Sequence, residues 1–376
     1  MNNNTNKFRL YVFLSTFARN LIEVFIPVIL YKNGYSLREV IFYFLIANLV
    51  SAILSYPCVL FAKKYSNKIL SIIGIISFLL LQIFLNRISV SYTYLILVGI
   101  LFAIYRRCYW LPRRYYNLKI IRGKNISTKY SIISIINQVG IIVSTYIGSL
   151  LLDYVGIEIL TIISIIIFIV SIIPLFKFKF EHEKNSEKIE FFKTLKMIPK
   201  GNIYQFGSYE LLNVLKFLFA LYLFIYVKDN FKTIGIVNLI TNLAVILSTY
   251  LYGRMLDKDK NYLKFSILMI CITFLLKANV TNYLVIAIAF LEGIFSKMYE
   301  VSINREFLEL GEKFEYYNYN LVYELTQNVF RTLVVLLLFI FNIDLKIMIY
   351  ITLLFIIIGC FIDFKEINKK KFKVKD

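Results

Sequence analysis

The sequence predicts an all-α polytopic membrane protein with twelve transmembrane helices arranged as two six-helix repeats. Three observations lead to this fold class. Of the 376 residues, 59% are hydrophobic and only 18% are charged, whereas a soluble domain averages about 25% charged residues. The apolar residues occur in a dozen runs long enough to cross a bilayer. A charged stretch near the middle of the chain divides these runs into two groups of six.

Each predicted span is a run of roughly 20 apolar residues, the length that a helix needs to cross a hydrocarbon core about 30 Å thick. A helix satisfies its own backbone hydrogen bonds, which lipid cannot do, so these runs are expected to be helical. The expected spans are 10–30, 39–61, 69–88, 92–111, 130–152, 157–176, 204–227, 233–255, 262–279, 282–302, 318–341 and 345–363.

The net charge of +20 comes from 43 Lys and Arg residues against 23 Asp and Glu residues. With both termini in the cytoplasm, 33 of the 43 basic residues fall in cytoplasmic segments, 7 in external loops and 3 within spans. Cytoplasmic loops of membrane proteins are enriched in Lys and Arg. We therefore expect a multi-pass protein of the cytoplasmic membrane with both termini inside. Its basic character then reflects the lipid bilayer as partner, and no nucleic-acid partner is needed to explain it.

The longest cytoplasmic stretch between spans separates the two groups of six. We expect an N-terminal six-helix bundle at 1–177, a cytoplasmic linker at 178–203, a C-terminal six-helix bundle at 204–364 and a basic cytoplasmic tail at 365–376. His182, the one histidine of the sequence, falls in this linker and is expected to be solvated. The protein is expected to be a monomer.

Similar landmarks recur in the two halves. Asn137 and Gln138 in the fifth span correspond to Gln327 and Asn328 in the eleventh. A basic segment follows both the second and the eighth span. Parallel repeats of six spans are typical of one large class of transporters.

The loop after the eighth span carries the most specific motif. Gly253, Arg254, Asp257 and Lys258 follow the pattern G-x-L-x-D-R-x-G-R/K, which joins the second and third helices of a half in the major facilitator superfamily. The chain resembles this superfamily over nearly its whole length. The resemblance implies the superfamily fold and a secondary active transporter that works by alternating access. It also favours export and makes a proton a candidate coupling ion.

The corresponding loop of the first half departs from the pattern. Lys64 and Lys68 fit it, but Lys63 stands where the acidic residue should be and no glycine opens the motif. The fifth span also lacks the Gly-Pro pair of the antiporter signature, which argues against drug–proton antiport without excluding it.

In the superfamily, this inner loop is thought to hold one conformation closed. Gly253 would let two helices approach closely, and the carboxylate of Asp257 would pair with Arg254 or with a basic residue of another helix. The simpler alternative is that Arg254 and Lys258 are ordinary cytoplasmic charges.

Ionisable residues near the middle of a span are costly and mark functional sites by default. In the first span, Arg19, Asn20 and Glu23 recur at three- and four-residue spacing and share one helical face. Arg19 lies roughly 15 Å deeper than Arg9, at 1.5 Å per helical residue. Glu23 lies one turn further on and can neutralise it. This face is expected to line a watery cavity between the halves.

Other spans contribute further polar residues to the expected site. The full set of candidate substrate or coupling residues is Arg19, Asn20, Glu23, Asn137, Gln138, Glu210, Asn213, Lys216, Glu292, Glu324, Asn328 and Arg331. Two roles are open for Arg19, Lys216 and Arg331: they meet an anionic or zwitterionic substrate, or they form internal salt bridges. The carboxylates are candidates to carry a coupling proton, since burial favours their neutral form. Structural pairs that only hold the bundle together are the alternative for all of them.

Several classes of function are disfavoured by what the sequence lacks. The four cysteines are too scattered for a zinc site or a disulfide framework, so neither a metal nor another cofactor is expected. No P-loop is present. A membrane-embedded enzyme that modifies lipids is the less favoured alternative because no catalytic constellation is evident. A second alternative is a sensor or immunity partner that keeps the transporter fold but moves no substrate.

Overall fold

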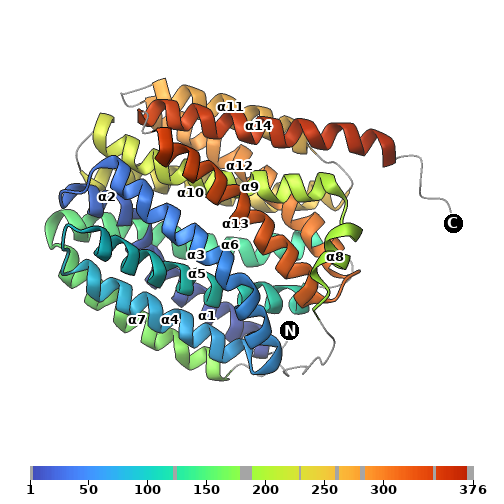
Figure 1. The fold of residues 1–376 in the computed structure, drawn as a ribbon, viewed down its shortest axis with the longest axis horizontal. Coiled ribbons are helices and arrows are strands. Elements are labelled where there is room, and N and C mark those ends of the chain that lie inside the picture. Colours follow the sequence, from blue (N-terminus) through green and yellow to red (C-terminus); the bar gives the residue numbers. More distant parts are fainter. Residues whose placement is uncertain are drawn as a thin grey trace.

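The computed structural model describes residues 3–121, 125–177, 189–227, 230–258, 262–279, 284–341 and 344–370. Within these ranges the chain is helical and has no strand. The long helices run side by side along one axis (Figure 1). The helices of the first half are α1 (Asn3–Asn20), η1 (Glu23–Phe25), α2 (Ile26–Lys32), α3 (Leu37–Lys64), α4 (Asn67–Leu85), α5 (Tyr92–Ile120), α6 (Ile126–Tyr154) and α7 (Ile157–Lys177).

The second half repeats this order after a short connecting helix. Its elements are α8 (Phe191–Met197), α9 (Lys200–Tyr222), the π-helix η2 (Leu223–Val227), α10 (Phe231–Leu256), α11 (Leu263–Asn279), α12 (Leu284–Gly311), α13 (Tyr316–Phe341) and α14 (Leu345–Lys370). Helix α9 begins four residues before the end of the predicted linker. Residues 178–188 of that linker, including His182, lie outside the described residues.

Polar residues fix where the long helices begin. Ser36 accepts a hydrogen bond from the Glu39 amide while the Glu39 carboxylate accepts one from the Ser36 amide, a reciprocal capping box. Ser91 caps α5 and Asn230 caps α10 through their side-chain oxygens. These caps satisfy amides that a helix leaves unpaired, so α3, α5 and α10 each start at a defined residue.

Nine helices in the described part of the chain are long and apolar enough to cross a membrane. The first of them combines α1, η1 and α2 into one span, Thr5–Lys32. The three remaining predicted spans correspond to α11, which has 17 residues, to α12 and to α14. Helix α12 has 28 residues but carries Glu292, Lys297 and Glu300 along its middle. Helix α11 is therefore shorter than the nine spans and α12 is more charged, while the apolar part of α14 is Leu345–Ile358.

Helices of the two halves pack in corresponding pairs. In the first half α1 packs on α6 and α7, while α5 packs on α3 and α4. In the second half α9 packs on α13 and α14, while α12 packs on α10 and α11. Each pair in one half therefore has its counterpart in the other. The main contacts between the halves are made by α6 with α10 and by α3 with α13.

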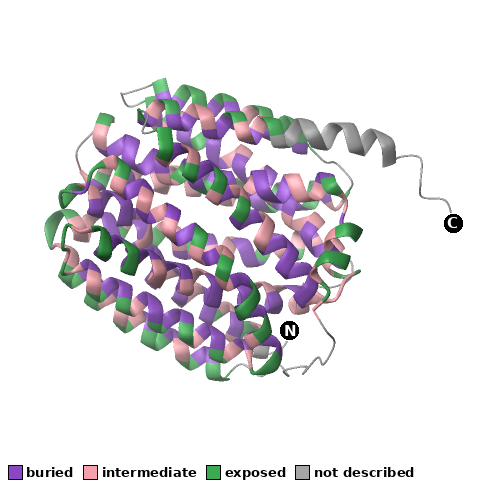
Figure 2. Ribbon diagram, in the orientation of Figure 1, coloured by how far each residue is buried: buried purple, intermediate pink, exposed green. Residues whose placement is uncertain are grey.

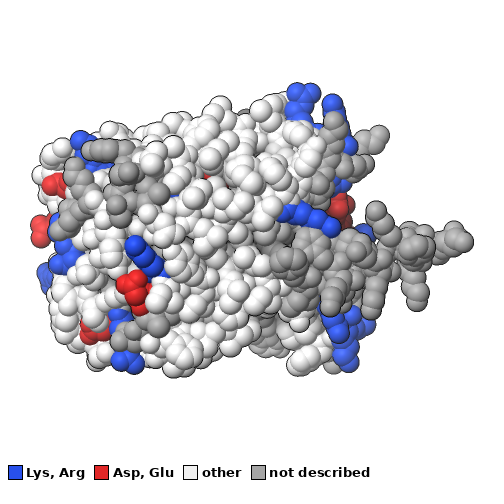
Figure 3. All heavy atoms as spheres, turned by 90° about the horizontal axis from the view of Figure 1, so that it is seen from above, with Lys and Arg blue, Asp and Glu red and all other residues white. Residues whose placement is uncertain are grey.

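The outer surface of the bundle is largely apolar. Exposed residues lie on the outer faces of the helices, and buried residues on the inner faces (Figure 2). Large apolar side chains such as Ile162, Leu247 and Leu268 are more than half exposed. Charged side chains gather towards the two ends of the long axis, with few between them (Figure 3). This distribution suits a protein whose waist contacts lipid and whose ends contact water.

Two close helix contacts depend on glycines of α6 and α10. A Cβ atom added at Gly148 in α6 would collide with the backbone carbonyl oxygen of Leu21. A Cβ atom at Gly253 in α10 would collide with the Ser131 side chain of α6. Small residues let membrane helices approach closely, so these positions set the spacing of α6 from both of its neighbours.

Replacing Gly148 with alanine is therefore expected to destabilise the protein by about 1–3 kcal/mol, the usual cost of overpacking. The matched control is Gly140→Ala on the same helix, where the added Cβ would meet Phe13 at an ordinary 3.4 Å. Thermal unfolding of the two variants in detergent measures the difference. Equal apparent Tm values for both variants would show that the α1–α6 contact does not need glycine.

Candidate functional site

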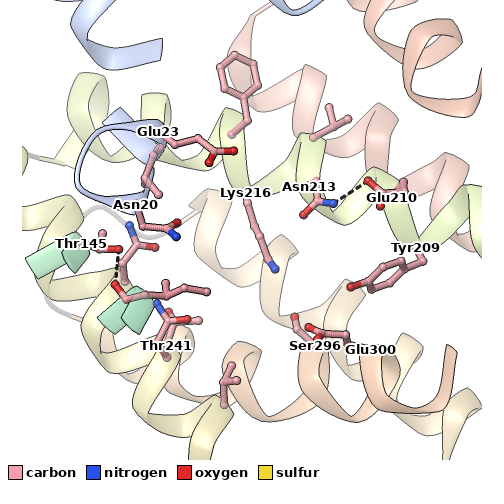
Figure 4. A pocket seen from close by; sticks show the side chains of 18 of the residues that line it. Asn20, Glu23, Thr145, Tyr209, Glu210, Asn213, Lys216, Thr241, Ser296 and Glu300 are labelled. Atoms are coloured by element: carbon pink, nitrogen blue, oxygen red, sulfur yellow. Dashed lines mark hydrogen bonds between the residues drawn. The ribbon is translucent and has the colours of Figure 1, made fainter. Parts of the chain in front are cut away.

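A cavity of about 480 Å³ lies between the two halves. It is lined by residues of α1, η1, α3, α5 and α6 from the first half and of α9, α10, α12 and α13 from the second. Its volume falls within the range of pockets that bind small organic ligands, about 300–1,000 Å³. The wall combines aromatic rings, amides and many charged side chains (Figure 4).

The first span is discontinuous beside this cavity. Helix α1 ends at Asn20, the backbone turns into the short 3₁₀ segment η1, and α2 then begins with Pro27 in its first turn. The corresponding span of the second half changes to a π-helix at Leu223–Val227. Interrupted helices frequently form substrate sites in transporters. The break places Glu23 where its carboxylate pairs with Arg19 at 2.9 Å.

Aromatic rings and hydroxyls hold the basic residues of α1 and α5. The Arg19 guanidinium lies 5.1 Å from the centre of the Trp110 ring, and the Arg113 guanidinium lies 4.8 Å from the same ring. Arg113 also donates hydrogen bonds to Tyr109 at 2.8 Å and to Asn137 at 2.6 Å. Cation–π contacts of this kind strengthen when water is excluded.

Two buried ion pairs order the second half around the cavity. Arg331 of α13 pairs with Glu210 of α9 at 3.0 Å, and Asn213 donates a hydrogen bond to the same carboxylate at 2.7 Å. Lys277 of α11 pairs with Glu292 of α12, and both side chains are buried. Buried charges are stable only when they are paired and hydrogen-bonded.

Other ionic contacts join the two halves. Glu324 of α13 pairs with both Arg107 and Arg114 of α5. Lys297 of α12 pairs with Glu300 at 2.5 Å and donates a hydrogen bond to Ser134 of α6 at 2.6 Å. The Glu324 side chain is 1% exposed, so its pairing closes the wall between α5 and α13.

Helices α6 and α10 cap each other at both ends. Asp257 follows the last residue of α10 and accepts hydrogen bonds from the backbone amides of Ser127 and Thr128, at the start of α6. Asp153, near the end of α6, accepts hydrogen bonds from the backbone amides of Phe231 and Lys232, at the start of α10. A carboxylate is favoured at a helix N-terminus by free amides and by the helix dipole.

Contacts therefore link the halves at both ends of the cavity. At the Asp257 end, Asn67 of α4 donates a hydrogen bond to Tyr317 of α13, and the Tyr316 hydroxyl donates one to the Leu111 carbonyl oxygen. At the Asp153 end, the rings of Phe25 and Phe231 meet edge to face. The described arrangement thus holds a central cavity bridged on both sides.

Comparison with known proteins identifies the family. A family model described as the Major Facilitator Superfamily matches residues 10–227, which is more than half of the chain. The chain belongs to the Major Facilitator Superfamily. It is accordingly a multi-pass membrane transporter rather than an enzyme. No curated protein matches the sequence.

Solved structures with the same superfamily fold are similar over nearly the whole chain. Two of them are structures of a bacterial homologue of the iron transporter ferroportin in an outward-facing state, one of them with soaked iron. The iron-soaked structure has a TM-score of 0.70 at 12% identity and the other 0.69 at 13% identity. Each match covers 97% of this chain and 99% of the other. At this identity the likeness establishes the fold alone.

In this superfamily member, the cavity brings together ten of the twelve predicted substrate or coupling residues: Arg19, Asn20, Glu23, Asn137, Gln138, Glu210, Asn213, Lys216, Glu292 and Arg331. The other two lie behind its wall. Glu324 is buried between Arg107 and Arg114. Asn328 accepts a hydrogen bond from Arg331 and donates one to Ser55 of α3.

The predicted gating residues of the superfamily motif are placed at the surface or at helix contacts. Gly253 meets α6. Asp257 bonds to backbone amides of α6 and, among the described residues, to no basic side chain, which differs from the expected pairing. Arg254 lies over the Tyr250 ring and Lys258 is exposed. In the first half, Lys64 lies over the Tyr65 ring and Lys68 donates a hydrogen bond to the Phe176 carbonyl oxygen.

The sequence analysis did not assign all of the arginines that form the basic wall of the cavity to a membrane span. The fourth span was expected to end at residue 111, which placed Arg113 and Arg114 in a cytoplasmic loop and left Arg106 and Arg107 near the inner end of the span, but α5 continues to Ile120. Those arginines line the cavity: Arg106, Arg107, Arg113 and Arg114. Two pairs of them are seven residues apart and so share a helical face. That spacing was the available signal for a longer, inward-facing helix.

Four further residues were also missed. Lys297 and Glu300 line the cavity although their region was assigned to a cytoplasmic loop and span end. Lys277, near the end of the expected span 262–279, is buried with Glu292. Trp110, which falls at the inner end of the expected span 92–111, lines the cavity between two arginines. Each of these side chains is stabilised by a partner from another helix, which local sequence does not reveal.

Proposed function

We propose that the chain is a secondary active transporter of the cytoplasmic membrane that exports a small molecule by alternating access of the central cavity. The observation that carries this proposal is the cavity itself: a space of about 480 Å³ between two six-helix halves, walled by charged and polar side chains. Membrane-embedded charges are too costly to be retained without a use. Both termini are proposed to lie in the cytoplasm, because basic residues dominate the loops on that side.

The contacts that bridge the cavity support alternating access. Asp257 joins α10 to α6 at one end and Asp153 joins α6 to α10 at the other. Breaking one set while the other persists would open the cavity to one side of the membrane only. Such rocking of two repeats about a central site is the general mechanism of transporters built this way.

A proton is proposed as one coupling ion. Four carboxylates line the cavity and each is paired with a cation: Glu23 with Arg19, Glu210 with Arg331, Glu292 with Lys277 and Glu300 with Lys297. Protonation of any of these carboxylates would release its basic partner. A pH gradient imposed on proteoliposomes that contain the purified protein tests this step.

The proposal predicts that a cysteine in the cavity reacts from both sides of the membrane. Asn213 is suitable because its side chain is exposed to the cavity. In an Asn213→Cys variant without the native cysteines, an impermeant maleimide added inside or outside sealed vesicles is expected to label the cavity in both cases. Glu312→Cys and Lys232→Cys are the one-sided controls, because these exposed residues lie at opposite ends of the bundle.

Labelling of Asn213→Cys from one side only, under every ion gradient tested, would reject alternating access. It would favour a chain that keeps the superfamily fold but serves as a sensor or partner protein.

One of the similar structures was soaked with iron, but we do not propose iron as a substrate of this chain. A cation would enter a wall in which basic residues outnumber acidic ones. Within the described residues, no group of three or more His, Cys, Asp or Glu side chains is placed to hold a metal ion.

A further inference from the structure

The cavity wall carries more positive than negative charge. Four carboxylates line it: Glu23, Glu210, Glu292 and Glu300. Glu324 is buried directly behind the wall. Nine basic residues line it: Arg19, Arg106, Arg107, Arg113, Arg114, Lys216, Lys277, Lys297 and Arg331. Even with Glu324 included, four positive charges remain without a matching carboxylate.

Every one of those five carboxylates is already paired with basic residues of the wall. Glu23 pairs with Arg19 and Glu210 with Arg331, while Glu324 is shared by Arg107 and Arg114. The remaining two pairs are Lys277–Glu292 and Lys297–Glu300.

Three basic residues of the wall have no carboxylate within ion-pair distance in the described part of the chain. Arg113 is buried and held by the hydroxyls of Tyr109 and Thr16 and by Asn137. Arg106 donates a hydrogen bond to Asn48 at 2.9 Å. Lys216 has neither an ion pair nor a hydrogen bond to any described residue, although it belongs to a membrane-spanning helix.

Lys216 extends from α9 into the open space of the cavity (Figure 4). Its amine points between Asn20 on one side and Tyr209 on the other, and Ser296 lies nearby. The side chain is exposed to the cavity and not to the outer surface. A charged amine at this depth costs at least about 2.5–3.5 kcal/mol on insertion scales. In the described part of the chain no carboxylate forms an ion pair with this amine, so it is free to pair with an anion that enters the cavity.

We propose that the cavity binds an organic anion whose carboxylate or phosphate group pairs directly with Lys216, with Arg106 as the second cationic contact. The surrounding hydroxyls and amides of Tyr209, Ser296 and Asn20 supply further hydrogen-bond partners for the oxygens of such a group. The aromatic rings of the wall and the volume of about 480 Å³ fit an organic molecule better than a bare inorganic ion. The inference rests on the proposed function in taking this cavity as the substrate site.

The electrostatic field of the cavity provides a test that needs no knowledge of the substrate. In the Asn213→Cys variant without native cysteines, the reaction rates of an anionic and a cationic methanethiosulfonate reagent are compared, namely the sulfonatoethyl and trimethylammonioethyl forms. A neutral methyl reagent corrects for access. Fields in clefts raise the local concentration of counter-ions by about 10-fold or more. The anionic reagent is therefore expected to be favoured at least tenfold, relative to the same ratio for a free thiol in solution.

Lys216→Gln is expected to lower this preference at least threefold. The matched control is Lys232→Gln, which removes the same charge from an exposed position at one end of the bundle; it is expected to leave the ratio unchanged. Using a ratio cancels any change in thiol reactivity that the substitution itself causes. Faster reaction of the cationic reagent, or a ratio insensitive to Lys216→Gln, would overturn the proposal.

Protection experiments assign the anionic group. Citrate that slows labelling at position 213 indicates carboxylate recognition, and glucose 6-phosphate that does so indicates phosphate recognition. Equal protection by uncharged glucose would contradict an anion site.

These measurements do not depend on transport. If Asn213→Cys is labelled from one side only but the anionic reagent reacts faster, alternating access is rejected and the anion site is supported. If Asn213→Cys is labelled from both sides but the cationic reagent reacts faster, alternating access is supported and the anion site is rejected.

Discussion

Replacing Glu324 with glutamine is expected to destabilise the protein by about 3–5 kcal/mol, the cost of leaving a buried charge without its partner. Glu324 is 1% exposed and pairs with both Arg107 and Arg114. Glutamine keeps the shape and one carbonyl oxygen but removes the negative charge. Two guanidinium groups of α5 would then face α13 with no anion between them. The apparent Tm of the variant purified in detergent measures the loss.

The control for this prediction is Glu309→Gln. Glu309 pairs with Arg305 at 2.6 Å, but its side chain is 44% exposed, and exposed pairs contribute about 0–1 kcal/mol. A small shift is therefore expected there. If both substitutions lower the Tm equally, the buried cluster has no special role in holding the halves together.

A second substitution separates charge imbalance from loss of packing. Adding Arg107→Gln to Glu324→Gln is expected to recover part of the lost stability, because one buried cation fewer then lacks a partner. Arg107 is the better choice because its side chain is 4% exposed, against 17% for Arg114. The interaction energy from the double-mutant cycle gives the size of the recovery. A double variant less stable than the single one would refute the charge explanation.

Asp257→Asn and Asp153→Asn are expected to shift the conformational equilibrium in opposite directions. Asp257 accepts two backbone hydrogen bonds and one from the Thr128 hydroxyl at the start of α6, and Asp153 accepts two at the start of α10. Hydrogen bonds to charged groups contribute about 1.5–3 kcal/mol, and 1.4 kcal/mol is a factor of ten. Each substitution is thus expected to open its own end at least tenfold more often.

Accessibility of the Asn213→Cys cavity position from each side of sealed vesicles measures this shift. Asp257→Asn is expected to raise labelling from the cytoplasmic side and Asp153→Asn from the external side. Asp344→Asn is the matched control, because Asp344 accepts hydrogen bonds from Tyr226 and Lys346 within the second half and, in the described part of the chain, has no hydrogen-bond partner in the first half. If both substitutions raise labelling from the same side, or if Asp344→Asn also changes the labelling, the hypothesis that Asp257 and Asp153 control gating is rejected.

The sequence was most informative about properties that many residues of one helix share, such as hydropathy and net charge. Long apolar runs and the distribution of Lys and Arg were enough to predict the helical membrane fold, and the loop around Asp257 was enough to predict the superfamily. The polar face of the first span was also visible, because Arg19, Asn20 and Glu23 lie at helical spacing within an apolar run. Ten of the predicted residues line one cavity, although their roles there remain predictions.

The sequence was least informative where charge is neutralised by another helix. Lys277 and Glu292 are 15 residues apart, and Arg107 and Glu324 are more than 200 apart. The seven-residue spacing of the α5 arginines indicates a shared helical face, but it does not reveal the carboxylate on α13 that neutralises them, so α5 was expected to end too early. The same limit applies to Asp257, whose partners are backbone amides of α6. Because nearly every residue has a backbone amide, a sequence motif cannot show which amides bind the Asp257 carboxylate.

The unpaired amine of Lys216 has an electrical consequence for the transport cycle. In a cell with a negative interior, moving one elementary charge across the whole potential is worth about 2.3 kcal/mol per 100 mV. An empty cavity with surplus positive charge would be drawn to face the cytoplasm, whereas a cavity filled by an anion would be closer to neutral. The membrane potential would then affect the conformational change of the empty transporter and have little effect on that of the anion-bound transporter. The resting potential alone would keep presenting an empty site to the cell interior.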